Sequence, residues 1–438
     1  MSKTLSIGVA GLGTVGAGLL ELLAAEQSVI SARAGSSINV VAVSARDKSK
    51  DRGVPLEGYT WFDDPVEMAK SADIDVLVEL IGGEEGVAKQ VVETALQAGC
   101  HVVTANKALL AHHGTALATL AEQNGVVLAY EAAVAGGIPA IKGLREGLAA
   151  NDITEVFGIL NGTCNYMLTE MAATGAPFDD ILSDAQELGY AEAEPSTDVD
   201  GFDAAHKLAL LASLAFARPV DFDQVSITGI RAIEPIDIEY AQELGYRIKL
   251  LGQATRNGDQ ITQTVQPYLV PKEAPIARVD GVLNAVMLRG SFVGDVLLVG
   301  RGAGGGPTAS AVAADLIDIA RGIRPATFGV AVEQLKQGAT ESKPSNGASD
   351  GSEAYYLRLL VTDKPGVFAD IAATLRDNSI SLETVVQRAH KPDAAAPVVI
   401  TTHKASPAAM RSALASIAAM DTVLAPPQLL PIMDVDAA

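Results

Sequence analysis

Acidic side chains crowd together immediately before an apolar helical stretch. Asp203 and Lys207 are four residues apart at the start of that stretch, so both side chains lie on one face of the predicted helix. Carboxylates at this density repel one another unless a cation compensates for their charge. The segment therefore indicates either an exposed helix ion pair or an active site, and composition alone favours neither. The crowded carboxylates are Glu192, Glu194, Asp198, Asp200 and Asp203.

A glycine-rich turn near the start of the sequence predicts a dinucleotide site. Gly11, Gly13 and Gly16 follow a strand-like apolar run and open an amphipathic helix that ends near Ala25. The first glycine permits the tight turn, the second lets the backbone approach a pyrophosphate, and the third allows close helix packing. A plain strand-to-helix turn is the alternative. The strand, the helix and a following strand together favour cofactor binding.

The end of the second predicted strand bears on the choice of cofactor. No carboxylate stands at Ser44 or Ala45 to bind a ribose 2′-hydroxyl, and Arg46 and Lys48 follow instead. Basic side chains there favour NADP, because an arginine can pair with the 2′-phosphate. Asp47 lies between the two bases, so an ordinary solvated charge run is an equally good interpretation. Use of NAD stays open.

Two further segments could contact a ligand. Thr104 ends a predicted strand and Lys107 follows it, at the edge where open α/β sheets bind ligands. Lys107 could polarise a carbonyl, or it could be an exposed lysine behind an Asn106 helix cap. A second glycine loop, 301–309, precedes a helix predicted to begin near Ser310. That loop could close over an anion, or it could be a flexible turn.

The pattern of apolar runs predicts an α/β protein of several domains. Strand-like runs alternate with helical patterns in the first part of the chain, which is typical of a Rossmann-type parallel sheet. We assign residues 1–135 to this cofactor domain and residues 136–337 to an α+β domain for substrate binding and oligomerisation. Residues 338–354 read as a Ser/Gly-rich linker. The predicted strands of the first domain are 5–10, 38–43, 76–80, 101–104 and 126–130.

The two later domains are predicted in less detail. The middle domain has a long acidic helical segment over 178–216, with strands at 155–160, 260–269 and 295–299. Residues 355–438 follow the order βαββαβ, which is that of a ferredoxin-like domain. Its strands are predicted at 354–361, 379–387, 397–403 and near Val423, and its helices at 366–377 and 407–419.

Composition excludes several classes of function. Among the 438 residues, 32 Lys and Arg against 53 Asp and Glu give a net charge of −21, a field that would repel nucleic acid. Cys100 and Cys164 lack metal-ligand spacing and suit a reducing cytoplasm. The longest apolar stretch in the middle of the chain, 208–217, is about half of the ~20 residues that cross a membrane. We expect a cytoplasmic protein that binds neither nucleic acid nor membrane.

Together, several motifs resemble the homoserine dehydrogenase family. The specific ones are Asn161-Gly-Thr-Cys-Asn-Tyr166 and the segment 189–207, to which 11–16, 104–107 and 131–139 add support. The region after the linker resembles an ACT regulatory domain. The resemblance is to the monofunctional form with an ACT domain and not to a fusion with aspartate kinase. Arg46 and Lys48 are the main departure from the family pattern.

The resemblance implies an activity and roles for individual residues. The family reduces aspartate 4-semialdehyde to homoserine with NAD(P)H, on the route to threonine, methionine and isoleucine. Lys207 would be the catalytic acid/base, and Glu192, Asp203 and Lys107 would hold the substrate. The implied cofactor contacts beyond the three glycines and the two bases are Leu12, Thr14, Val15, Thr104, Lys107, Gly189 and Gly306.

The resemblance also implies a cation, an effector and an assembly. A sodium ion would lie among oxygens of Glu131, Val134, Gly136 and Ile138. The ACT domain implies inhibition by threonine and a homodimer or homotetramer. Two other functions stay open: another NADP-linked reductase of an amino-acid pathway, and a catalytically silent sensor of nucleotide and amino acid.

Overall fold

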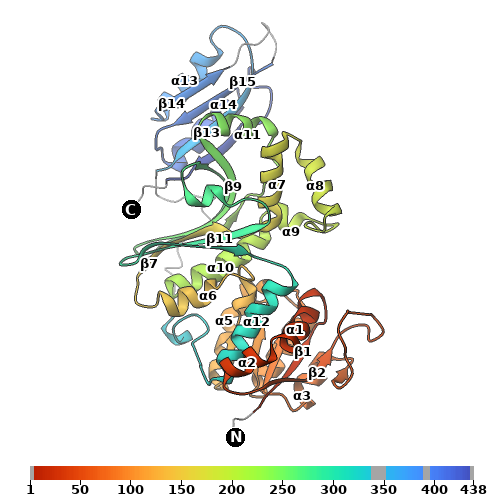
Figure 1. The fold of residues 1–438 in the computed structure, drawn as a ribbon. Helices are drawn as coiled ribbons and strands as arrows, with labels where there is room; N and C mark the ends of the chain where they lie inside the picture. Colours follow the sequence, from red (N-terminus) through yellow and green to blue (C-terminus); the bar gives the residue numbers. More distant parts are fainter. Residues whose placement is uncertain (1–3, 337–351, 388–394, 435–438) are drawn as a thin grey trace.

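The computed structural model describes residues 4–336, 352–387 and 395–434. Two units lie at opposite ends of a long central sheet, the N-terminal one at the bottom of Figure 1 and the C-terminal one at the top. The predicted linker lies outside the described residues, apart from 352–354, and Ala354 is already the first residue of a strand. The predicted α/β class, with a Rossmann-type domain and a ferredoxin-like domain, is confirmed.

The N-terminal unit is a parallel sheet with the strand order β3-β2-β1-β4-β5-β6, which is that of dinucleotide-binding domains. Its central strands β1, β4 and β5 are almost entirely buried and mostly apolar, because helices cover both faces. The three-residue β3 was not predicted, and the strand predicted at 126–130 is only two residues long. The strands are β1 (Leu5–Ala10), β2 (Ile38–Ser44), β3 (Thr60–Phe62), β4 (Val76–Glu79), β5 (His101–Thr104) and β6 (Leu128–Ala129). The helices are α1 (Thr14–Ala25), α2 (Gln27–Ala34), α3 (Pro65–Ser71), α4 (Val87–Gln97) and α5 (Lys107–Gln123).

One helix from late in the sequence completes this unit. α12 (Gly305–Ala320) packs beside α1, and Val312 and Leu316 share a buried cluster with Leu19. Figure 1 shows α12 among the N-terminal helices. The prediction that this helix begins near Ser310 was wrong by five residues. Glycines and Pro307 hid its first turn, where a proline is tolerated because that N–H has no helical partner.

The central sheet runs in the order β12-β11-β7-β9-β10 and continues into the C-terminal unit. The acidic segment 178–216 is not one helix as predicted but three, because Gly189, Pro195 and Gly201 interrupt it. The strands are β7 (Ile153–Ile159), β8 (Val225–Ile227), β9 (Tyr246–Asn257), β10 (Gln260–Pro271), β11 (Leu283–Gly290) and β12 (Gly294–Arg301). The helices are α6 (Ala140–Lys142), α7 (Gly162–Thr174), α8 (Phe178–Glu187), α9 (Ser196–Val199), α10 (Phe202–Phe216) and α11 (Pro235–Glu243). Single turns of other helix types occur at Glu131–Ala133, Gly143–Gly147, Pro275–Arg278 and Val332–Gln334.

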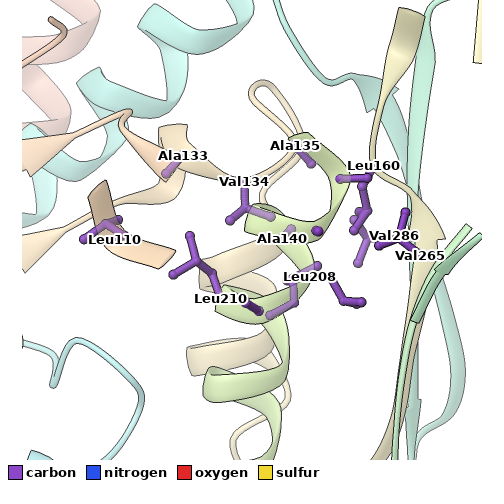
Figure 2. Close-up of a cluster of buried hydrophobic side chains, with 14 of the residues drawn as sticks. Leu110, Ala133, Val134, Ala135, Ala140, Leu160, Leu208, Leu210, Val265 and Val286 are labelled. Atoms are coloured by element: carbon purple, nitrogen blue, oxygen red, sulfur yellow. The ribbon is translucent and has the colours of Figure 1, made fainter. Parts of the chain in front are cut away.

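α10 lies in the middle of the largest apolar core. Its leucines Leu208 and Leu210 pack among side chains from the central sheet and from α5, as Figure 2 shows. Almost every residue of α10 is buried, including the charged Asp203 and Lys207. A helix that is apolar on all sides has to be surrounded by protein. The two charged groups at its start are therefore held in a setting that contains little water.

The C-terminal unit has the predicted order βαββαβ, with its strands arranged β16-β13-β15-β14. The last strand lies at 428–432 and not near Val423, which forms only an isolated bridge with Val361. Pro426 and Pro427 account for the delay, because proline cannot donate to a strand ladder. The elements are β13 (Ala354–Thr362), α13 (Val367–Asp377), β14 (Leu382–Gln387), β15 (Ala395–Thr402), α14 (Pro407–Ala418) and β16 (Gln428–Ile432).

A buried carboxylate connects the C-terminal unit to the central one. Asp237, in the first turn of α11, is fully buried. It accepts hydrogen bonds from the Arg358 guanidinium at 2.6 and 3.1 Å and from the Tyr356 hydroxyl at 3.1 Å, both on β13. It also accepts the Glu234 N–H at 3.0 Å in a capping box. The start of α11 therefore depends on a side chain from the C-terminal unit.

Within the described residues, no single helix is long and apolar enough to cross a membrane, and only α1 and α2 taken together, bent by 82°, pass on length and composition.

Replacing Arg358 by leucine should destabilise the protein, because it leaves the buried Asp237 carboxylate without its charge partner. We expect a loss of about 3–5 kcal/mol, seen by calorimetry as a lower thermal midpoint. The control is Arg376→Ala. The side chains of Arg376 and its partner Asp377 are 74% and 65% exposed, so this substitution should change the free energy of unfolding by less than about 0.5 kcal/mol. Equal shifts in the two variants would contradict a structural role for Arg358.

Candidate active site

The glycine turn between β1 and α1 leaves room for a ligand. Gly11 has a φ of +101°, and a Cβ there would lie 2.5 Å from the Leu80 carbonyl oxygen. A Cβ on Gly16 would lie 2.1 Å from the Gly11 carbonyl oxygen, so the helix can approach the turn only if this residue is glycine. A Cβ on Gly13 would meet nothing within 4 Å. The N–H groups at the start of α1 can therefore receive an anion.

Four basic residues follow β2, and one of them contacts this turn. Arg46 and Lys48 are exposed. Arg52, which no sequence pattern singles out, donates from Nε to the Leu12 carbonyl at 3.1 Å. Lys48 and Arg52 both lie over the Trp61 ring, 5.8 and 5.7 Å from its centre. Asp47, between the two predicted bases, accepts hydrogen bonds from the backbone and hydroxyl of the nearby Ser49.

Glu79, the last residue of β4, was not predicted as a site residue. It is fully buried and accepts the Thr104 hydroxyl at 2.5 Å and the Ile81 and Gly82 N–H groups at 2.8 and 3.1 Å. Burial raises the pKa of this carboxyl. Glu79 thus holds the loop after β4 against the end of β5. A single acid at the end of an apolar strand carries no signal of this role.

Asn106 connects the same loop to α5. Its side-chain oxygen accepts the Leu109 N–H at 3.0 Å, and its amide donates to the Gly83 carbonyl at 2.7 Å. The prediction of an Asn106 cap is therefore correct. Lys107 is not merely an exposed lysine in the first turn, because its ammonium lies 3.2 Å from the Asp203 carboxylate of α10. The cap is thus confirmed, and a contact of Lys107 with a carbonyl group stays a prediction.

Asp203 lies between two lysines. Lys207 donates from Nζ to Asp203 at 2.6 Å and to the Leu160 carbonyl at 2.7 Å. The Asn161 amide donates to Asp203 at 2.8 Å and to Asp198 at 2.7 Å. The Asn161 oxygen caps α7 by accepting the Cys164 N–H. The ion pair predicted from the spacing of Asp203 and Lys207 is present, and it is buried, not exposed: both side chains are less than a tenth exposed.

The charges of this cluster shift one another. Burial alone would raise the pKa of Asp203, but the Lys207 and Lys107 ammonium groups override it and hold that pKa well below its usual range. Asp203 in turn raises the pKa of Lys107. Burial and the Asp203 charge raise the pKa of Asp198. Asp203 is therefore an ionised group throughout the neutral range.

The other predicted site residues lie around this cluster. Glu192 is exposed in the loop after α8, and its charge contributes to the raised pKa of Lys107. Gly189 follows α8 with a φ of +73°, and Gly306 lies in the first turn of α12. Two of the crowded carboxylates lie elsewhere: Glu194 accepts hydrogen bonds from Ser196, and Asp200 pairs with Arg231 at the surface.

The second glycine loop lies between the fingerprint helix and the loop predicted to bind sodium. A Cβ on Gly305 would lie 3.0 Å from the Thr14 carbonyl oxygen, so α12 and α1 touch through their backbones. The Gly137 N–H donates to the Arg301 carbonyl at 3.0 Å. The loop is therefore a packed connection between the cofactor turn and residues 134–138.

The loop that follows Glu131 has the character of a cation site. Glu131 is 2% exposed, and burial together with the Asp315 charge raises its pKa to about 7. Its carboxylate accepts the Ile141 and Lys142 N–H groups at 3.0 and 2.8 Å. In the described part of the chain no hydrogen-bond donor reaches the buried carbonyls of Val134 and Gly136, whereas that of Ile138 accepts the Ala140 N–H. Unpaired buried carbonyls next to a carboxylate fit a hard monovalent cation.

The geometry defines a class of protein. A parallel sheet in dinucleotide order has an open glycine turn at its carboxyl edge, and a buried cluster of lysines and carboxylates lies at the same edge through Lys107. This combination defines an NAD(P)-dependent oxidoreductase.

Comparison with known proteins identifies the family. Family models described as "Homoserine dehydrogenase, NAD binding domain", "Homoserine dehydrogenase" and "ACT domain" match residues 11–131, 139–317 and 355–419. The homoserine dehydrogenase of Neisseria gonorrhoeae is 43% identical over 425 residues, which cover 97% of each chain. The chain belongs to the homoserine dehydrogenase family, whose members are oxidoreductases that act on a CH–OH group.

Solved structures agree with this assignment. The crystal structure of a homoserine dehydrogenase from Thiobacillus denitrificans is 42% identical to the chain, with a TM-score of 0.92 and 99% of both chains covered. A hyperthermophilic archaeal homoserine dehydrogenase mutant in complex with NADPH is 27% identical, with a TM-score of 0.62, over 72% of this chain and 97% of that one.

Proposed function

We propose that the chain reduces aspartate 4-semialdehyde to homoserine with NADPH, and that Lys207 supplies the proton. The observation that carries this proposal is the buried Lys207 ammonium, which is fixed by Asp203 and by the Leu160 carbonyl. An ammonium has three donors, and two of them are used here. The third is left for a substrate oxygen.

The chemistry divides between the cofactor and the side chains. NADPH, when bound, supplies hydride to the aldehyde carbon. Lys207 would donate its free N–H proton to the aldehyde oxygen, so that this oxygen, still bonded to carbon, becomes the hydroxyl of the product and Lys207 becomes a neutral amine. Asp203 orients the Lys207 ammonium by accepting its hydrogen bond at 2.6 Å. In the reverse direction the neutral amine accepts the hydroxyl proton.

The remaining charges suit the rest of the substrate. The half-exposed Lys107 ammonium can bind the α-carboxylate, and Glu192 and Asp203 offer carboxylates to the α-ammonium group. These contacts would place the aldehyde end of the substrate toward Lys207. They also require a substrate with both an ammonium and a carboxylate group, as aspartate 4-semialdehyde has.

Changing Lys207 to methionine should remove the proton donor while it fills the same space. We expect turnover to fall at least ~10²-fold and the affinity for NADPH to change little. Steady-state kinetics and a cofactor titration measure the two effects. Lys107→Met is the comparison variant and should mainly raise KM for the semialdehyde. Near-normal turnover in Lys207→Met would contradict the role of Lys207 as proton donor and would mean that its ion pair with Asp203 is only structural.

We infer that NADPH is preferred over NADH. Arg46 and Lys48 would bind the 2′-phosphate, with Arg52 beside them holding the Leu12 carbonyl of the turn. The archaeal relative in complex with NADPH supports this inference for the family. Leu12, Thr14 and Val15 would contact the phosphates, with Thr104, Gly189 and Gly306 near the rest of the cofactor.

Arg46→Ala should then weaken the affinity for NADPH about 10-fold and change the affinity for NADH less than about 2-fold, because only NADPH has a 2′-phosphate that Arg46 can bind. Fluorescence titration with each cofactor measures both constants. Lys70→Ala removes an exposed cation on α3 and serves as the control for a general effect of charge. Equal losses for the two cofactors would contradict the assignment.

We also infer a sodium ion, an assembly and a location. Oxygens of Glu131, Val134, Gly136 and Ile138 would hold sodium, which would place positive charge beside two buried acids.

We infer that the chain forms a homodimer or homotetramer. The edge strand β12 carries the exposed Val299, and the exposed Phe292 lies in the turn just before this strand, so that both apolar side chains suit a contact with another subunit. The cytoplasmic location is supported by two free, buried cysteines. The cofactor domain would comprise residues 1–135 together with α12.

The ACT domain is the candidate site of feedback by threonine. Its strand β13 supplies Arg358 to Asp237 at the start of α11, and α11 packs on α7, whose cap Asn161 binds Asp203. A change in the ACT domain therefore has a contiguous route of contacts to the lysine cluster. The pathway served would be that of threonine, methionine and isoleucine.

Threonine should accordingly inhibit the full chain, and Arg358→Lys should weaken that inhibition, because lysine cannot make the bidentate contact. We expect the half-inhibiting concentration to rise at least ~3-fold while turnover without threonine is preserved. Activity across a threonine series measures this. The exposed Arg376→Ala variant is the control. Unchanged inhibition in Arg358→Lys would exclude this route.

A further inference from the structure

Beside the lysine cluster, three side chains from three separate elements converge without a role in the proposed reaction. They are Glu84 in the loop after β4, His112 on α5 and His206 on α10. One ligand atom from each lies within 4.8 Å of the others. With His113 they bring three of the chain's six histidines to one corner.

The contacts within this group are incomplete. His112 Nε2 lies 3.1 Å from a Glu84 carboxylate oxygen. His206 is only 8% exposed, and neither of its ring nitrogens has a hydrogen-bond partner among the described residues. Its ring packs on Phe222, with 4.6 Å between ring centres, and on His112, with 5.7 Å. The His206 imidazole thus has a ligand atom near those of a second imidazole and a carboxylate, and no protein hydrogen bond competes for it in the described part of the chain.

The protonation state of His206 suits a ligand. Burial lowers its pKa to about 4, although the Asp203 charge acts in the opposite direction. The imidazole is therefore neutral near pH 7 and has a lone pair available. A neutral imidazole is the form that binds a metal.

The donor set selects a class of ion. Two imidazole nitrogens and one carboxylate oxygen are typical of zinc and similar transition metals, whereas calcium and magnesium prefer oxygen alone. Ligand distances of about 2.0–2.1 Å put tetrahedral ligands roughly 3.4 Å apart. The group must therefore contract slightly, and the more exposed Glu84 and His112 side chains can rotate to do so.

We propose that Glu84, His112 and His206 bind a zinc-type divalent cation with one coordination position open. The site joins the loop after β4, which belongs to the cofactor domain, to α10, which carries Asp203 and Lys207. An ion there would hold these two parts together. Because such a restraint would oppose relative motion of the loop and α10 during the catalytic cycle, we expect bound zinc to slow turnover.

Calorimetric titration of Zn²⁺ into chelator-treated full-length protein tests the site. We expect one equivalent per chain, with affinity weakened at least ~10-fold in His112→Asn and in Glu84→Gln. His113→Asn is the matched control, because His113 is next in sequence but pairs with Glu85 at 2.7 Å and lies outside the group. His206 is left unchanged because it adjoins Lys207. Co²⁺ should give a four-coordinate absorption band in the wild type that is missing in His112→Asn.

Two results would overturn the proposal. Equal zinc affinity in the wild type and His112→Asn, or equal weakening in His113→Asn, would exclude the site. If zinc binds but leaves turnover unchanged, the inference that the ion restrains the loop after β4 and α10 is wrong. We expect turnover to fall at least ~3-fold with zinc, to recover with chelator, and to be insensitive to zinc in His112→Asn. The calorimetry does not depend on catalysis, so it stands apart from a failure of the proposed reaction.

Discussion

The Asp203 carboxylate accepts contacts from two ammonium groups and one amide in a nearly dry interior, and the surrounding architecture follows from this requirement. A single buried charge would cost several kcal/mol, so each partner has to be delivered by a fixed element. α10 supplies Lys207 one turn away, α5 supplies Lys107, and the start of α7 supplies Asn161. The apolar core around α10 holds all three helix ends in register (Figure 2).

The need to pair the buried Asp203 carboxylate also links the cofactor domain to the central domain. Lys107 starts a helix of the cofactor domain, yet its partner belongs to the central domain. Asn106 and Glu79 fix the start of that helix to the loop after β4, at the edge where the glycine turn opens. α12 crosses back from the central sheet to pack on α1. The glycine turn and the cluster of Asp203 with its two lysines are therefore held in position by contacts between the two domains.

Sequence patterns predicted the parts of this protein that depend on local order. The glycine fingerprint, the strand alternation and the spacing of Asp203 and Lys207 each carry a periodic or turn-specific signal, and the corresponding elements are present. Arg52, Glu79 and His112 had no such signal, because their contacts join residues far apart in the sequence. Breaks at Gly189 and Gly201, and the glycine-rich first turn of α12, were misread because propensity does not fix where a helix ends. The prediction of a sodium site at residues 131–138 rests on the family resemblance, because no sequence pattern of its own indicates such a site.

The last strand of the chain has a consequence for biosynthesis. β8 covers β10 at Gln263 to Val265, whereas among the described strands it is β16 that covers the edge near Leu269, through the pairing of Leu269 with Ile432. During translation, this part of β10 stays open until residues 428–432 have left the ribosome. An open strand edge is a template for pairing with another chain. Newly made copies are thus exposed to intermolecular association from the synthesis of β10 until that of β16, and a nonsense mutation shortly before β16 would make that exposure permanent.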